Sequence, residues 1–421
     1  MEARQDSDKL AWDWIDALWE EAVKHVQLSS ICRKIESFVK RTFGQTATLL
    51  LPMVIGGFNV LYPIKIEGRS GNVLVRMPCL NQAVFPVEKT LAEAATVAYV
   101  DQRTHLRAPR VFHHGVDSYI GPFMIIEDLG SRRGMGQALE APRENLNNPA
   151  VLQPDISKAK LNSLYVEMAR SSNVPKSIFP LEGTTCKTAD EWCTVLAEMQ
   201  IAILIFQHND MVSSEDDCRN KYVARQLFRR LAKQGRLSSF GFAEDSCHQT
   251  AQALFASDWE FVYAAPTQFI LDPPWWLLLD VPEMWGAGIE DWRKTYETRL
   301  DPWISAMQEA EQEVSPESFL FSTYMRESWT TGRFWLNYAA RKSWAFDTIY
   351  WKYLDENFFG EREDGTPGEK MWKTKVHLLS GKERAAMERL VQAKMAESRT
   401  RVLIEWEAES AKKHLSRFLF D

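Results

Sequence analysis

Several features that define common classes of protein are scarce in this 421-residue chain. Its six cysteines form no C-x-x-C pair and no zinc-ligand spacing with histidine, which favours reduced thiols over a zinc module or a disulfide framework. The longest apolar runs, 49–57 and 273–279, are too short to cross a bilayer. The opening residues MEARQDSDKLAW are too polar for a signal peptide. We therefore expect a cytoplasmic protein with no membrane partner.

Basic clusters and several well-known catalytic motifs are also missing. The net charge of −7 is spread along the chain without a long basic run, so we expect no nucleic-acid partner. No G-x-S-x-G, H-E-x-x-H or G-x-x-x-x-G-K-[ST] stretch occurs, which leaves the serine hydrolase, zinc protease and P-loop classes without support. The patterning does not define an oligomeric state.

The first third of the chain changes its hydrophobic period twice. Residues 8–43 carry apolar side chains at helical spacing, and Asp6 or Ser7 is placed to cap this helix. Residues 48–80 read as three strands separated by turns. A helix is predicted over 88–104, followed by strands over 108–115 and 121–130. The order of three strands, one helix and two strands predicts a small sheet with a helix inserted into it.

The remainder of the chain is predicted to be mostly helical, so the fold class is α+β. Residues 131–190 are irregular and rich in proline. Helical patterns follow over 190–235, 283–310, 323–357 and 380–418. We predict an N-terminal helical extension over 1–47, a β-rich lobe over 48–128, a helical lobe over 129–360 and a helical tail over 361–421.

Three features of the β-rich lobe, a glycine turn, a strand cation and a helix acid, are suited to binding the phosphates of a nucleotide. Gly56 and Gly57, followed by Asn59, form a turn between two strands, where backbone can approach a phosphate closely. Arg76 ends the third strand, and Glu93 lies seventeen residues later on the helix, as a phosphate-contacting cation and its acidic partner would. Singly, each has a plainer interpretation as a hairpin turn or an exposed side chain. Their order along the chain favours the phosphate site.

These motifs resemble the aminoglycoside phosphotransferase / choline-kinase-like family, a branch of the protein-kinase-like fold. The resemblance covers most of residues 50–357. It implies two lobes with extra helices at both ends, ATP and magnesium as cofactors, and a small-molecule hydroxyl as acceptor. It also implies that Arg76 contacts phosphate, that Glu93 holds Arg76, and that Asp258 binds the metal. The segments that carry the resemblance are IGGFNVLYPIKI (55–66), NVLVRMP (72–78), EKTLAEAATVAYV (88–100), THLRAPRV (104–111), GPFMIIEDLG (121–130), SEDDCRNKYVARQLF (214–228), SDWEFVYAAPTQFILDPPWWLLL (257–279) and TGRFWLNYAARKSWAFDTIYWKYLDE (331–356).

The catalytic loop departs from the family pattern H-x-D-x-x-x-x-N. The best register makes Asp245 the catalytic Asp, which would orient or deprotonate the acceptor hydroxyl, and places Thr250 where the metal-binding Asn belongs. Too few residues then precede Asp258 for the usual hairpin, and 246–257 reads more like a short helix. A rival register over 207–210 contains His208 and Asp210, but we expect it to lie inside a helix with His208 on its surface.

Three interpretations of this departure stay open. In the first interpretation, the chain is an active kinase with a shortened loop, in which Asp245 is still functional and Gln249 or Thr250 weakly replaces the Asn. Alternatively it is a catalytically inactive pseudokinase that serves as a binding or scaffold protein. In the third interpretation, the stretch is a mispredicted exon junction in an ordinary enzyme. A purely structural helical protein is a further alternative, which specific nucleotide binding would contradict.

Overall fold

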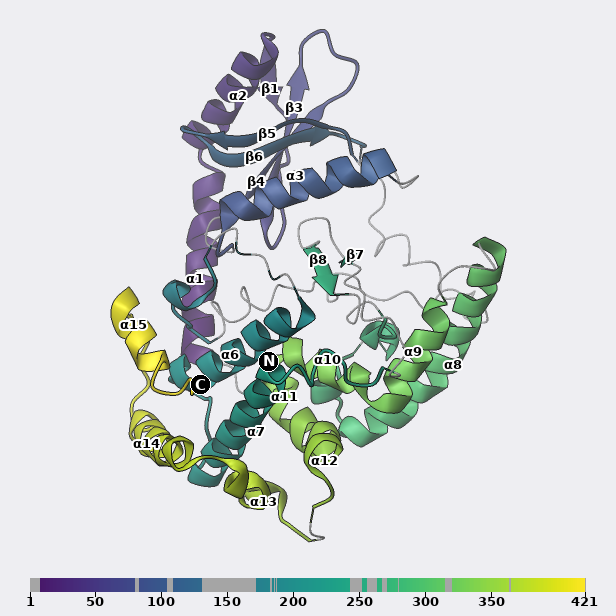
Figure 1. The fold of residues 1–421 in the computed structure, drawn as a ribbon. Helices are drawn as coiled ribbons and strands as arrows, with labels where there is room; N and C mark the ends of the chain where they lie inside the picture. Colours follow the sequence, from purple (N-terminus) through teal and green to yellow (C-terminus); the bar gives the residue numbers. More distant parts are fainter. Residues whose placement is uncertain are drawn as a thin grey trace. The chain divides into compact units, whose positions relative to one another are not determined.

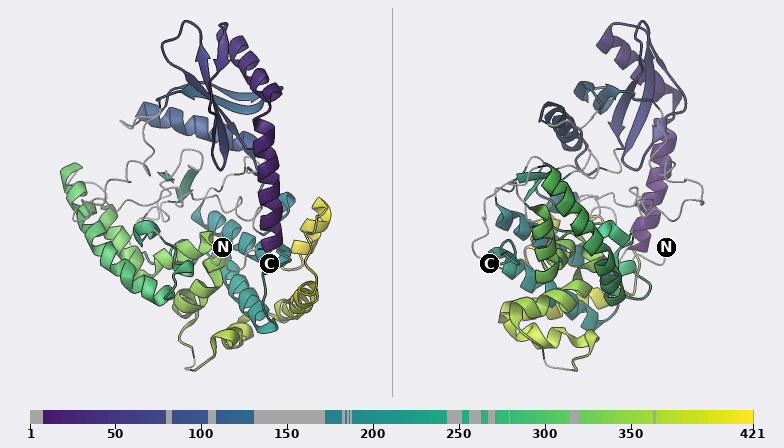
Figure 2. Two further views of the ribbon diagram at one scale, coloured as in Figure 1. Left: turned by 180° about the vertical axis from the view of Figure 1, so that it is seen from behind. Right: turned by 90° about the vertical axis from the view of Figure 1, so that its right-hand side faces the viewer.

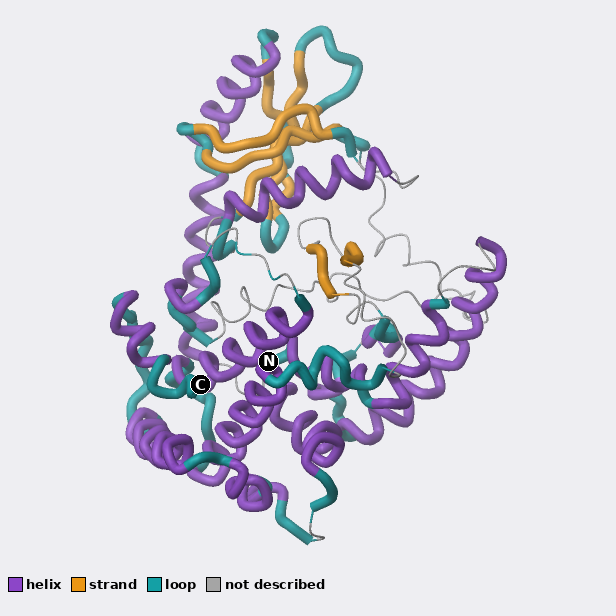
Figure 3. Tube along the Cα trace, viewed as in Figure 1, coloured by secondary structure: helices purple, strands orange, loops and turns teal. Residues whose placement is uncertain are grey.

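The computed structural model is mixed α+β, as the sequence predicts (Figure 1). It describes residues 8–79, 83–103, 109–130, 172–181, 184, 186, 188–242, 252–255, 263–266, 271–278, 280–314, 320–362 and 365–420. The chain divides into two compact units. Unit 1 comprises Met1–Trp12, Glu167–Ala253 and Ala264–Asp421, and unit 2 comprises Asp13–Val166 and Leu254–Tyr263. A six-stranded sheet lies in unit 2, whereas unit 1 is mainly helical (Figure 3).

The sheet of unit 2 is antiparallel and has the strand order β1-β3-β4-β6-β5, with β2 also paired to β3. β1 and β2 therefore act as one interrupted strand along the same edge of β3. The predicted succession of strands, helix and strands is confirmed, with boundaries moved by a few residues. The strands are β1 (Ala47–Leu49), β2 (Val54–Ile55), β3 (Asn59–Ile66), β4 (Val73–Pro78), β5 (Val111–Asp117) and β6 (Gly121–Glu127).

Alternation along the central strands separates the two faces of the sheet. Every second residue of β3 from Val60 to Ile66 is buried, and the register pairs Val60 with Met77 and Leu61 with Arg76. The first face packs on the helix α2 (Ser29–Phe43), whose Ile35, Phe38 and Val39 share its apolar core. Arg76 belongs to the opposite face because side chains alternate along a strand.

The single helix predicted over 8–43 is instead two helices, α1 (Lys9–Val26) and α2. The break falls at Gln27 and Leu28, with no glycine or proline to mark it. The carbonyl of Val26 accepts a hydrogen bond from the Tyr62 hydroxyl (3.0 Å), so the sheet holds the end of α1. Asp8 caps α1, accepting from the Ala11 N–H (3.0 Å), whereas the predicted caps Asp6 and Ser7 lie outside the described residues.

A third helix of unit 2, α3 (Pro86–Arg103), covers the second face of the sheet. Two views of the ribbon show α3 and α2 on opposite sides of the strands (Figure 2). α3 begins with Pro86 and carries Glu88 in its first turn, both of which favour a helix start. The sheet is thus held between an apolar layer on one side and a helix with buried polar side chains on the other.

Unit 1 is mostly helical from residue 190 onward, as predicted, but non-helical residues 207–214 and 401–407 interrupt the stretches predicted over 190–235 and 380–418. Its central helix α6 is buried at every residue from Met199 to Phe206, and Thr188 caps it by accepting from the Glu191 N–H (3.2 Å). Ser214 caps α7 in the same way. The helices are α6 (Ala189–Phe206), α7 (Glu215–Lys233), α8 (Ile289–Val314), α9 (Phe321–Thr331), α10 (Arg333–Arg341), α11 (Ser343–Ile349), the π-helical turn Tyr350–Leu354, α12 (Asp355–Phe359), α13 (Trp372–Lys375), α14 (Gly381–Glu397) and α15 (Ala408–Leu415), with short 3-10 turns at Lys176–Ile178, Trp275–Leu278, Pro282–Met284, Gly368–Lys370 and Val376–Leu378.

The C-terminal helices pack on α7 through polar contacts. A capping box starts α14, in which Ser380 and Glu383 exchange hydrogen bonds (3.2 and 2.6 Å). Glu383 also forms an ion pair with Arg230 of α7 (2.9 Å), and its carbonyl accepts from Tyr222 (3.0 Å). One acid therefore starts α14 and attaches it to unit 1.

Two further strands, β7 (Gln252–Phe255) and β8 (Tyr263–Pro266), form a separate two-stranded sheet. The predicted short helix over 246–257 is wrong at 252–255, where the chain is extended; the rest of that range lies outside the described residues. Among the described residues, no helix combines the length and apolarity that a bilayer span requires.

Candidate functional site

Arg76 and Glu93 meet between β4 and α3. The Nε of Arg76 lies 2.8 Å from Oε1 of Glu93, and the two side chains are 17% and 6% exposed. The neighbouring Val73 and Val75 face the apolar core, so strand alternation directs Arg76 toward α3. The predicted pairing of the strand cation with the helix acid is confirmed. An ion pair this well buried joins the two elements because either charge alone would be costly there.

Lys89 is a second cation at this site that the sequence reasoning missed. Its Nζ donates a hydrogen bond to Oδ1 of Asn59 (2.9 Å) and lies 3.9 Å from Oε2 of Glu93. Its spacing of four residues before Glu93 on one helix was the available signal. Asn59, Arg76, Lys89 and Glu93 therefore form one polar cluster, hereafter the α3 cluster. Two positive charges and one negative charge give it a formal net charge of +1, which suits an anion.

The predicted glycine turn closes the β2–β3 hairpin next to the α3 cluster. The Gly56 N–H donates to the carbonyl of Asn59 (2.8 Å), and the carbonyl of Phe58 accepts from the Cys79 N–H (2.8 Å). Gly56 lies outside the left-handed backbone region, and an added Cβ would make only an ordinary 3.4 Å contact. The turn thus does not need glycine at residue 56 for its own conformation. Gly57 lies in the same turn and is exposed.

The predicted catalytic and metal-binding residues fall elsewhere in the chain. Asp245, Thr250 and Asp258 lie outside the described residues. Among the residues that the structure does describe, no three His, Cys, Asp or Glu side chains gather as metal ligands would. The structure therefore brings together Asn59, Arg76 and Glu93 with the glycine turn, and leaves the other three predictions untested.

Arg333 of α10 lies beside both ends of the segment that contains Asp245 and Asp258. This side chain is 1% exposed. It donates to the carbonyl of Gly241 (2.8 Å), and its guanidinium stacks 3.8 Å from the centre of the Phe242 ring. Its Nε lies 4.0 Å from the Asp272 carboxylate at the far end of the segment. Space is tight at Gly241, where an added Cβ would lie 2.5 Å from the Thr331 hydroxyl.

Asp272 is the acid at this second attachment point. Asn337 donates to it (2.8 Å), Ser328 also donates to it, and Arg341 lies 3.9 Å away. Burial raises the pKa of the Asp272 carboxyl, while Arg341 and the hydrogen bonds oppose that shift. Arg333, Asn337 and Arg341 recur every four residues in an otherwise apolar helix. That stripe of polar residues was the sequence signal for a buried polar contact.

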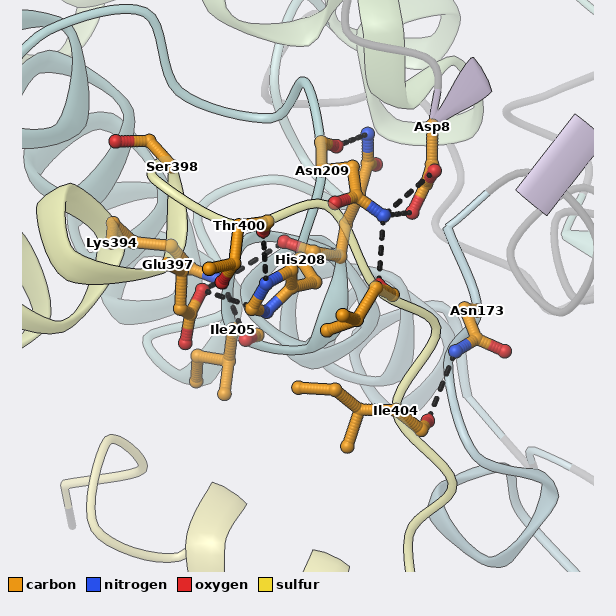
Figure 4. A network of polar contacts seen from close by, with 12 residues as sticks. Asp8, Asn173, Ile205, His208, Asn209, Lys394, Glu397, Ser398, Thr400 and Ile404 are labelled. Carbon is orange, nitrogen blue, oxygen red and sulfur yellow. Dashed lines mark hydrogen bonds and ion pairs between the residues drawn. The ribbon is translucent and has the colours of Figure 1, made fainter. Parts of the chain in front are cut away.

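The rival register at His208 and Asp210 is part of a structural network instead (Figure 4). The two residues lie in the loop between α6 and α7, so the expectation of a helix with His208 on its surface is wrong. The ring Nε2 of His208 lies 3.0 Å from the carbonyl of Thr400. Hydrogen bonds from Arg401 hold the pKa of Asp210 below its usual range, which makes its carboxylate a weak base.

Asn209 ties the same loop to Asp8, just before α1, and to the segment between α14 and α15. Its Nδ2 donates to the buried Asp8 carboxylate (3.0 Å) and to the carbonyl of Val402 (2.9 Å). Lys394 adds hydrogen bonds to the carbonyls of Ile205 and Gln207 (2.9 Å each), as Figure 4 shows in part. The H-x-D letters at 208–210 are thus explained by attachment of the C-terminal segment.

No protein-family model matches the chain, and no curated protein sequence matches it. The resemblance drawn from the motifs accordingly remains a hypothesis about function.

Proposed function

We propose that this chain is an ATP-dependent phosphotransferase of the protein-kinase-like class, related to the aminoglycoside phosphotransferases, that acts on a small-molecule hydroxyl. The observation that carries the proposal is the buried ion pair between Arg76 and Glu93, with 2.8 Å between the charged atoms. Catalysis of phosphoryl transfer consists mainly of positioning and charge neutralisation. A cation fixed by a helix acid beside a glycine turn suits that task.

The topology of unit 2 supports the same proposal. The helix α3 is inserted between β4 and β5, and β6 returns to the centre of the sheet beside β4. The β2–β3 hairpin that contains Gly56 then ends next to Asn59 and the α3 cluster. Three separate parts of the chain therefore contribute to one positively charged site.

ATP and magnesium are the cofactors of this proposal, and ATP supplies the phosphoryl group. The net positive charge of the α3 cluster fits a phosphate chain. Arg76 and Lys89 would contact the phosphates, while Glu93 would keep Arg76 oriented. The resemblance assigns metal binding to Asp258 and Thr250, and orientation of the acceptor hydroxyl to Asp245.

A second candidate function is non-catalytic nucleotide binding, as in a pseudokinase that acts as a binding or scaffold protein. It is favoured by one observation, the Thr250 that stands where the family has its metal-binding Asn. Both functions use the α3 cluster, so they differ in turnover and not in nucleotide binding.

Calorimetric titration of ATP with magnesium tests the shared part of the proposal. We expect Arg76→Met to weaken binding roughly 10- to 100-fold, because a charge-assisted hydrogen bond contributes about 1.5–3 kcal/mol. Lys65→Met is the matched control, because Lys65 is an exposed cation of β3. Absence of binding to the unchanged protein, or equal weakening by both substitutions, would refute the site.

Asp258→Ala and a turnover assay then separate the two functions. Loss of the magnesium dependence of ATP binding in Asp258→Ala is the expected result for either function. Transfer of labelled phosphate to members of a panel of hydroxyl compounds supports the enzyme. Magnesium-dependent binding without transfer or hydrolysis supports the non-catalytic function.

A further inference from the structure

A cavity of about 520 Å³ lies in unit 2 on the sheet face that packs against α1 and α2. Its walls include Trp19 and Val26 of α1, Ile55 of β2, and Val60 and Tyr62 of β3. Sites for small molecules usually measure ~300–1,000 Å³, so the cavity is large enough for a whole ligand. A volume of this size in an apolar layer lacks the packing contacts that a protein core normally has.

The cavity is separate from the α3 cluster because the sheet lies between them. Val60, Tyr62 and Met77 line the cavity, whereas Leu61 and Arg76 are paired neighbours on the other face. Strand alternation directs these two sets of side chains to opposite sides. A ligand in the cavity would therefore not compete with a nucleotide at Arg76.

The lining is mainly apolar, and the ionisable side chains in it that can be positively charged are basic ones. Among the described lining residues, Lys34 of α2 and His25 of α1 are the basic side chains, and none is an acid. Lys34 is exposed to solvent, and no described carboxylate lies within ion-pair distance of its ammonium group. The Tyr62 hydroxyl is already used, since it donates to the carbonyl of Val26 (3.0 Å). Burial raises the pKa of the Tyr62 phenol, so this group adds no negative charge.

We infer that this cavity binds a small amphipathic acid, with its apolar body among Trp19, Val60 and Tyr62 and its carboxylate beside Lys34. Burying the apolar body removes hydrophobic surface from water on both partners. Lys34 supplies the charge that distinguishes an acid from a neutral molecule of the same length. This inference stands whether or not unit 2 binds nucleotide.

Titration of the purified full chain with dodecanoate, at concentrations below micelle formation, tests the inference, and dodecan-1-ol is the neutral probe. We expect saturable dodecanoate binding, weakened about two- to fivefold by Lys34→Met, with dodecanol binding unchanged by that substitution. Lys40→Met is the matched control, because Lys40 is an exposed lysine of α2 that does not line the cavity. It should leave both affinities unchanged.

A cavity-filling variant locates the apolar part of the ligand. Ala22 of α1 lines the cavity, so Ala22→Phe should weaken dodecanoate and dodecanol alike. Thermal unfolding of each variant checks that it folds. If Ala22→Phe is destabilised, Lys34→Met still tests whether the cavity binds the acid, because this substitution is at an exposed side chain. No dodecanoate binding to the unchanged protein, or equal binding by Lys34→Met, would overturn the inference. ATP titration of the same samples reports on the α3 cluster independently.

Discussion

Asp355 is fully buried at the start of α12, and the ionised form of its carboxyl is therefore poorly solvated. Arg362 and Lys375 lie 3.7 and 3.9 Å away, but neither carboxyl oxygen has a hydrogen-bond donor among the described residues. Lys375 instead donates to the carbonyls of Phe359 and Gly360 (3.1 Å each). Burial raises the pKa of Asp355 to about 6, against an ordinary value of 3.8.

We predict that Asp355→Asn stabilises the protein above pH 7. The pKa of Asp355 is higher in the folded state than in the unfolded state. The contribution of the protonated carboxyl to folding stability is therefore fully present below about pH 4 and is lost as the pH rises through 6. A shift of about two units corresponds to roughly 3 kcal/mol, which the neutral Asn would retain. Urea unfolding at pH 4.5 and pH 7.5 should show an advantage that grows with pH. Asp301→Asn, an exposed acid, should change little at either pH.

Two results would contradict this account of Asp355. In one, the difference in free energy of unfolding between Asp355→Asn and wild type is the same at both pH values. In the other, the variant is less stable than wild type at pH 7.5. In the variant, Lys375 keeps its hydrogen bonds to two carbonyls and Arg362 keeps its ion pair with Glu356.

Arg76 and Lys89 show what sequence reasoning recovers at the level of single residues. Arg76 was predictable because it ends an alternating apolar strand at a fixed distance from a helix acid. Lys89 was not predicted, because a lysine in the first turn of a helix usually faces solvent; its contact with Asn59 depends on how the hairpin folds back. Arg333 was missed for a similar reason, since its partner Gly241 lies 92 residues earlier in the chain.

Among the elements, α10 has the clearest structural task, because one of its side chains attaches two distant segments of unit 1. Arg333 donates to Gly241 and to the carbonyl of Tyr324 (2.8 and 2.7 Å) while stacking on Phe242. A lysine keeps the charge but lacks the planar fork that makes these contacts at once. The arrangement of α10 therefore depends on the guanidinium itself.

We predict that Arg333→Lys lowers the free energy of unfolding by roughly 3 kcal/mol, the cost of leaving buried partners unsatisfied. Arg326→Lys on α9 is the matched control, because Arg326 pairs with Asp301 at the surface. It should cost less than about 1 kcal/mol. Chemical denaturation of the three proteins measures both values, and a difference of less than 1 kcal/mol between the variants would refute the role given to Arg333.

Element boundaries were predictable where local sequence decides them. Strand alternation identified β3 and β4 because one face of the sheet is a continuous apolar core. The break between α1 and α2 was not predictable from local sequence, because it involves a hydrogen bond from Tyr62, on a strand distant in sequence, to the carbonyl of Val26. The loop between α6 and α7 carried a usable signal that was overlooked: Ser214 with Asp217 three residues later is a helix start.

At the scale of the whole molecule, burial is unevenly distributed among the helices of unit 1. All residues of α6 from Met199 to Phe206 are buried, whereas α15 buries only Ala411 and Leu415. Opening of α6 requires disruption of the core, while α15 can open locally. Hydrogen exchange of the α15 amides should therefore report only the local stability of that helix.

Hydrogen exchange followed by mass spectrometry should find the slowest amides of unit 1 in α6 and much faster exchange in α15. Peptides from α7, whose buried residues also extend over most of its length, serve as the internal reference and should resemble α6. Equal protection of α15 and α6 would show that the C-terminal helices unfold together with the core.

The attachment of Gly241 and Asp272 to one arginine has a consequence for how this protein tolerates change. When the two ends of a flexible segment are held close together, the entropy cost of closing it rises with the logarithm of its length. Halving or doubling the stretch between these residues changes that entropy by only about 0.6 kcal/mol. As far as closure entropy is concerned, unit 1 can therefore accept a longer or shorter connection between Gly241 and Asp272, provided that the pairing of β7 with β8 is kept.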